Sequence, residues 1–105
     1  MKQQYDYKIV VDSQLGPRQG TLTMEENDNA ISGILSLLGF ENHVEGKREG
    51  RMLYLRHKLQ TLVSLLSCQS ELELQESGLA GIIHSEFGSM EIRGERITET
   101  ENQTV

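Results

Sequence analysis

Two stretches of this chain share one frame: each begins with Gly-Ile, ends on glycine and is fourteen residues long. The first is GILSLLGFENHVEG, from Gly33 to Gly46, and the second is GIIHSEFGSMEIRG, from Gly81 to Gly94. In and around both, apolar and polar residues alternate with the period of two that is typical of β-strands. A glycine inside a strand marks a bend, a bulge or the close approach of another backbone. The pattern therefore predicts an all-β fold in which equivalent strands bend at equivalent places.

The similarity extends beyond these two stretches. A displacement of 48 residues places Ile31 on Leu79, and a displacement of 50 places Leu22 on Leu72. We interpret the chain as two related four-stranded units, and hence as about eight antiparallel strands in a meander that forms a small barrel or a half-closed sheet. The predicted boundaries are residues 1–98 for one domain, about 5–48 and 52–96 for its units, and 99–105 for a flexible tail.

One segment allows two interpretations. RMLYLRHKLQTLVSLL, residues 51–66, alternates like a long strand, but its last part also carries apolar residues at helical spacing. We predict a strand, because the alternation starts earlier and both flanks have strand patterns. A helix over 58–66 is the alternative.

The glycine and alternation pattern resembles that of a known group. GTLTM, ISGILSLLG and ELELQESGLAGIIHSEFGSMEIRGER are similar to the repeated G-x-L-x-L and L-x-G-x-I pattern of small bacterial calycin-like β-barrel proteins. The resemblance covers most of the chain. It implies an eight-stranded barrel or half-closed sheet, and it implies no activity, because the group has no agreed function.

Charge and cysteine content limit the function classes. The chain has 105 residues and a net charge of −6, which disfavours nucleic acid and anionic membranes as partners. No apolar run approaches the ~20 residues of a membrane-spanning helix. The single cysteine, Cys68, cannot form an internal disulfide, so we expect a cytoplasmic protein.

His57 is the most informative polar residue, because it stands between Leu55 and Leu59 in the apolar register. A polar group on that face needs a partner. We consider His57 and Tyr7 as polar contacts for a small apolar ligand in the barrel; the alternative is a histidine bonded to a neighbouring side chain.

The remaining titratable residues indicate no chemistry. His43 and His84 lie in polar stretches and are expected at the surface, without a metal or a cofactor. The chain has no G-x-S-x-G nucleophile motif, and we predict no enzymatic activity.

A final group of apolar residues falls on the face opposite the predicted core and suggests a self-association surface. Its members are Val10, Ile34, Leu38, Leu62, Leu66 and Ile82. We therefore predict a non-enzymatic binding or interaction module that forms a homo-oligomer, most simply a dimer. The alternative is a calycin-like carrier of a small apolar ligand in the barrel lumen.

Overall fold

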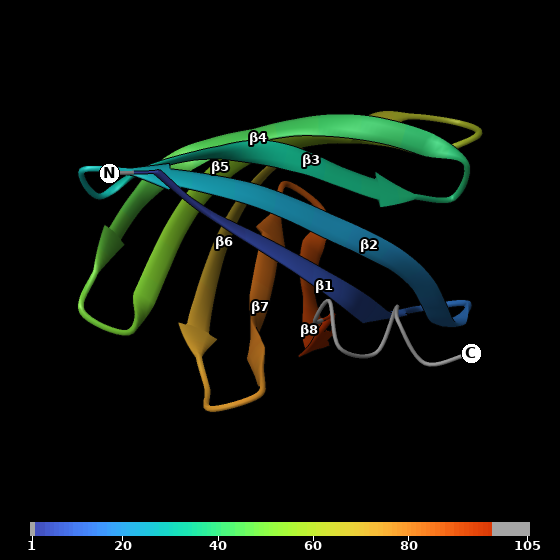
Figure 1. Cartoon of the computed structure of the whole chain (residues 1–105). Coiled ribbons are helices and arrows are strands. Elements are labelled where there is room, and N and C mark those ends of the chain that lie inside the picture. Colours follow the sequence, from blue (N-terminus) through green and yellow to red (C-terminus); the bar gives the residue numbers. More distant parts are fainter. Residues whose placement is uncertain (1, 98–105) are drawn as a thin grey trace.

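The computed structural model describes residues 2–97, which form a closed antiparallel barrel of eight strands in meander order. Each strand pairs with its neighbours in the chain, and β8 pairs with β1 to close the ring (Figure 1). The all-β meander is thereby confirmed, and the barrel is closed rather than half-open. The strands are β1 Lys2–Ser13, β2 Gly16–Asn27, β3 Ala30–Leu37, β4 Phe40–Glu49, β5 Met52–Gln60, β6 Leu65–Leu74, β7 Gly78–Ser85 and β8 Gly88–Arg96.

The predicted alternation places one apolar face of every strand inside the barrel. The side chains of Ile9, Leu22, Leu53 and Ile83, from four different strands, are each at most 2% exposed. Leu, Ile and Val supply most of the core because small barrels are filled by side chains that interdigitate across the lumen. The predicted tail, residues 99–105, lies outside the described residues.

The long strand predicted over residues 52–66 is wrong, and so is the helix over 58–66. β5 ends at Gln60 and β6 begins at Leu65, with a hairpin turn between them. The turn contains neither Gly nor Pro. Instead the Thr61 amide donates to the Ser64 carbonyl at 2.8 Å, and the Thr61 hydroxyl oxygen accepts from the Ser64 amide at 3.0 Å. A threonine can organise a turn through its side chain, but its letter resembles that of any strand residue.

This turn also changes the direction of Leu66. The sequence pattern placed Leu66 on the outer face, but the side chain is partly buried and packs against the core. Likewise, the segment SLLSCQSEL contains no turn and forms most of β6.

Strand pairing repeats along the chain with a single offset of 48 residues. Tyr5 pairs with Met24 as Leu53 pairs with Leu72, which makes Met24 the counterpart of Leu72. The separate offset of 50 predicted around Leu22 is therefore not the one used in the barrel. The register relation supports our interpretation that the two halves are related, and duplication itself stays a prediction. The other matching pairs are Met24–Gly33 with Leu72–Gly81, and Gly33–Val44 with Gly81–Ile92.

Candidate ligand-binding site at the apolar end of the barrel

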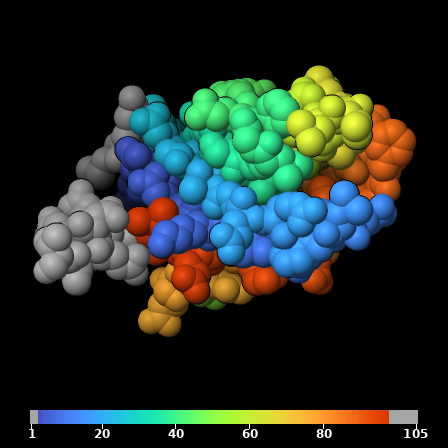
Figure 2. Space-filling model, turned by 90° about the vertical axis from the view of Figure 1, so that its right-hand side faces the viewer, coloured from blue at the N-terminus to red at the C-terminus, as the bar shows by residue number. Residues whose placement is uncertain are grey.

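Four two-residue turns lie at the same end of the barrel, because alternate turns of a meander return to the same side. They connect β1 to β2, β3 to β4, β5 to β6 and β7 to β8. Three of them are at the right of Figure 1, and all four gather on the face shown in Figure 2, as light blue, green, yellow and orange surfaces. These turns carry large apolar side chains that are exposed to solvent: Leu15 (84%), Leu38 (40%), Leu62 (90%), Val63 (92%) and Phe87 (77%). We call this set the apolar end.

Side-chain hydroxyl groups hold three of these turns in shape. The Ser13 hydroxyl donates to the Gly16 carbonyl at 2.6 Å, and its oxygen accepts from the Leu15 amide at 3.2 Å. Ser85 makes the same two contacts in the β7–β8 turn, and its oxygen accepts from the Phe87 amide at 3.2 Å. The turn backbone is thus satisfied locally, and the apolar side chain that follows is left facing solvent.

The opposite end of the barrel is polar. Its turns carry residues such as Asp28, Asn29 and Arg51. A network of polar groups lies beneath them. The Arg48 guanidinium donates to the Glu26 carboxylate at 3.0 Å and to the Tyr5 hydroxyl at 3.2 Å. The two ends therefore differ sharply in chemistry.

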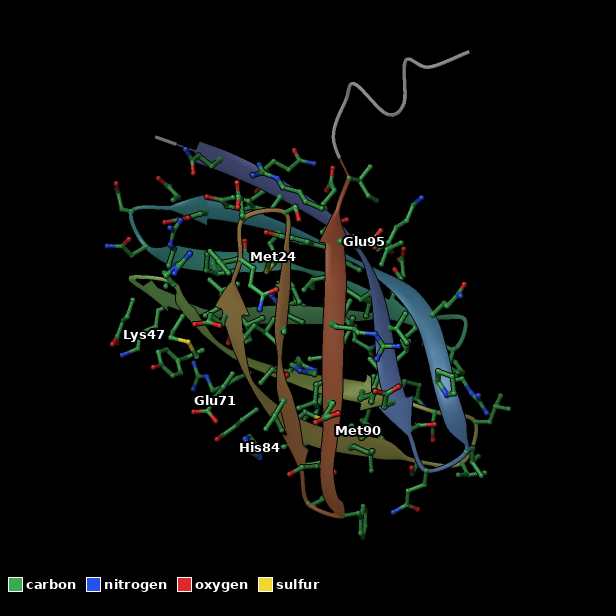
Figure 3. All side chains as sticks on the ribbon, turned by 90° about the horizontal axis from the view of Figure 1, so that it is seen from below. Met24, Lys47, Glu71, His84, Met90 and Glu95 are labelled. Atoms are coloured by element: carbon green, nitrogen blue, oxygen red, sulfur yellow. The ribbon has the colours of Figure 1, made fainter. Side chains whose placement is uncertain are left out.

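A cavity of about 550 Å³ opens at the apolar end. Its inner wall is formed by the last core side chains of the barrel, and its outer wall by the turns. Met90, which lies close to the β7–β8 turn in Figure 3, belongs to the inner wall. Its apolar lining residues are Val11, Leu15, Leu37, Leu38, Leu59, Leu62, Val63, Leu66, Phe87 and Met90.

Arg18 is the one formally charged residue among those that line this cavity. It lies in β2 opposite Val11, in the register that faces the interior. The side chain is half-buried, and its guanidinium donates to the adjacent Pro17 carbonyl at 3.1 Å. No carboxylate of residues 2–97 forms an ion pair with it.

The predicted ligand contacts His57 and Tyr7 lie in the packed interior and are not among the residues that line the cavity. The His57 Nε2 atom is 2.7 Å from the Ser70 hydroxyl, and its Nδ1 atom is 3.0 Å from the Lys58 carbonyl. Nδ1 can therefore donate to the carbonyl while Nε2 accepts from the serine. Burial lowers the pKa of His57 and raises the pKa of Tyr7, so both side chains are neutral near pH 7.

The residues predicted to form an oligomer interface are not on one surface. Val10, Ile34 and Ile82 belong to β1, β3 and β7. Ile34 and Ile82 are four strands apart in a ring of eight and thus lie on opposite sides. Leu38 and Leu62, by contrast, belong to the apolar end.

A second region with hollows is polar. Two hollows of about 730 and 700 Å³ share several lining residues on the outside of the strands from β4 to β7. His84 points toward Glu71 there (Figure 3), with 3.0 Å between its Nε2 atom and the carboxylate. His43 is 4.0 Å from Glu45. Within residues 2–97 no three or more His, Cys, Asp or Glu residues are grouped so that they could hold a metal ion.

The chain matches no protein-family model, no curated protein and no solved structure. The described residues contain no helix that is long and apolar enough to cross a membrane. The site therefore rests on the geometry of this chain alone.

Leu15, Val63, Phe87 and Arg18 were not identified as functional residues by the sequence pattern. Their signal was nevertheless present, because apolar residues stood in segments that connect alternating strands, as in SQLGPR and SEFGS. A turn normally has polar residues and glycine at these positions. An apolar residue in a two-residue turn is thus a usable indication of a contact surface.

Proposed function

We propose that this protein is a non-enzymatic binding module that takes the apolar part of a small ligand into the mouth of its barrel. The observation that carries the proposal is the apolar end: five large apolar side chains in solvent around an apolar cavity of about 550 Å³. This volume is within the range of ~300–1,000 Å³ that is usual for small-molecule sites. Binding there would remove apolar surface from water, which is worth about 25 cal/mol per Å².

Backbone geometry gives independent support. Leu38 has a φ of 57°, a left-handed conformation that favours Gly, Asn or Asp and costs a branched side chain about 1–2 kcal/mol. A residue that violates local preference is expected where function requires its side chain. Leu38 is part of the cavity lining, in agreement with a binding role.

The proposal includes no catalytic role for the His57–Ser70 pair. Both nitrogens of His57 have partners within the fold, and neither residue lines the cavity at the apolar end. The pair satisfies two buried polar side chains, as packing in a barrel interior requires.

Fluorescence of an apolar dye such as 1-anilinonaphthalene-8-sulfonate tests the site. We expect dye binding to the native protein, and strong loss of it in the double variant Leu62→Ser and Val63→Ser. The matched control is Ile34→Ser with Ile82→Ser, which removes two half-exposed apolar side chains from the outer sheet surface. Equal dye binding by both double variants would contradict the proposal. Native mass spectrometry of the purified protein would then detect any ligand retained at the mouth.

Self-association through the same surface is the second candidate function. Four of its side chains are at least 77% exposed, and large exposed apolar patches are typical of protein contacts. Sedimentation at several protein concentrations would detect a dimer. Dimerisation that persists in the Leu62→Ser and Val63→Ser variant would exclude the apolar end as its interface.

A further inference from the structure

Resting on the proposed function, we propose that the ligand is an amphiphile with a single anionic headgroup, such as a medium-chain fatty acid, and that Arg18 binds this headgroup. The inference concerns a small molecule in free solution. It names the class of ligand and the residue that selects it.

The first step of the argument is the charge distribution in the cavity. Ten of its lining residues are apolar, and Arg18 is the single residue with a formal charge. A ligand that fills such a space must therefore be largely apolar and can offer one anionic group to the wall. A guanidinium is well suited to a carboxylate, because it can donate two parallel hydrogen bonds.

The second step is the state of Arg18 itself. Within the described part of the chain, its hydrogen-bond acceptor is the Pro17 carbonyl, in the adjacent peptide group. Two other arginines of the barrel behave differently: Arg48 binds Glu26 at 3.0 Å, and Arg93 binds Asp12 at 2.9 Å. The chain carries 16 acidic residues against 10 Lys and Arg, yet no carboxylate of the described residues occupies Arg18. Its capacity for charge-assisted hydrogen bonds is therefore available to a ligand.

The third step is placement. Arg18 lies opposite Val11 in the β1–β2 register, next to the β1–β2 turn that ends at Gly16. It thus belongs to the mouth of the barrel, where a headgroup stays in contact with water. An apolar chain bound by this headgroup would extend inward along Leu37, Leu59 and Met90, which line the same cavity. A headgroup at the mouth avoids the cost of burying an ionised group.

Isothermal titration with decanoate and decan-1-ol, both as monomers, tests the assignment. We expect decanoate to bind the native protein about ten- to a hundredfold more tightly than the alcohol, as a charge-assisted contact predicts. Arg18→Gln should remove this preference and leave affinity for decan-1-ol unchanged, while Arg18→Lys should retain much of it. Arg51→Gln, in a turn at the polar end, is the matched control and should have no effect. Each methylene added between octanoate and decanoate should tighten binding about fourfold.

The outcomes separate the two proposals. Equal affinity of the native protein for decanoate and decan-1-ol, or an Arg18→Gln variant that still prefers decanoate, would overturn the role of Arg18 and leave the apolar site intact. Binding of neither compound would overturn the proposed function as well. Arg18-dependent binding to phosphatidylglycerol vesicles without binding of free decanoate would overturn the assignment to a free amphiphile.

Discussion

Gly33 and Gly81 lie where the backbone of a neighbouring strand occupies the space that a side chain would need. A Cβ atom at Gly33 would be 2.0 Å from the Thr23 carbonyl oxygen, and one at Gly81 would be 2.0 Å from the Glu71 carbonyl oxygen. Main-chain atoms cannot rotate away as the end of a side chain can. The sharp bend at each position therefore depends on the absence of a side chain.

We expect Gly33→Val and Gly81→Val each to lower the free energy of unfolding by about 1–3 kcal/mol, the usual cost of overpacking. Urea denaturation measures this effect. Valine is a sharp probe because β-propensity favours it over glycine in an ordinary strand. Ser32→Val, at the exposed neighbouring position in β3, is the control and should be neutral or slightly stabilising. Stabilisation by valine at both glycines would contradict the steric role.

His57 makes the stability of the barrel depend on pH. Its pKa in the folded protein lies below the ordinary 6.5, with burial as the largest cause. Below about pH 6.5 the unfolded chain therefore binds a proton more readily than the folded chain, and stability falls as pH decreases. Above this pH both forms are neutral, and the contribution of His57 is fully present.

We expect the free energy of unfolding of His57→Gln to change less between pH 7 and pH 5 than that of the native protein. The difference in slope should be at most about 1.4 kcal/mol per pH unit, the value for one proton. Chemical denaturation at several pH values measures it. His43→Gln, whose native side chain is 65% exposed, serves as control and should retain the native slope. An identical pH dependence in His57→Gln would show that His57 is not the group responsible.

The β3–β4 hairpin combines a strained turn with a functional side chain. Leu38 and Gly39 have φ angles of 57° and 82°, and a two-residue turn of this kind favours Asn-Gly. At the other end of the barrel, Asp28 and Asn29 adopt similar angles with residues that suit them. The chain therefore accepts unfavourable turn chemistry only where the turn belongs to the apolar end.

Leu38→Asn should raise the free energy of unfolding by about 1 kcal/mol, because asparagine adopts the left-handed conformation at lower cost. The same change should weaken dye binding, since it removes an apolar side chain from the cavity wall. Thermal denaturation and dye titration measure the two effects. Leu15→Asn is the control: it also removes an apolar side chain from this end, but at a position without positive φ. It should weaken dye binding without raising stability, and a stability gain there would remove the conformational explanation.

Alternation predicted the strands well, because each strand of a small barrel has one buried and one wet face. It was wrong between β5 and β6, where Thr61 and Ser64 form a turn from residues that are also common in strands. It also missed the apolar end as a unit, since Leu62 and Val63 in a sequence look like core residues. Only the position of the turn converts them from buried residues into exposed ones.

At the scale of the whole molecule, closure was the property that the sequence could not decide. Every hairpin within a half follows the offset of 48, but the two junctions between the halves do not. In β4–β5, Val44 pairs with His57, and the same offset would pair Ile92 with Ile9. In β8–β1, Ile92 pairs with Val11 instead, a slip of two residues. A slip of two keeps every side chain on its own face, so alternation contains no trace of it.

Closure also determines how the molecule should unfold. Each junction between the halves contains six residue pairs, and both halves contribute to one core, so neither has a separate interior. We expect Gly33→Val to reduce the hydrogen-exchange protection of the slowest amides in β6 and β7 as much as that of those in β2 and β3. Gly81→Val should have the reciprocal effect, because both changes lower the same global free energy. Ser32→Val should leave protection in both halves unchanged. Loss of protection confined to the half that carries the valine would mean that the halves unfold as separate units despite the closed ring.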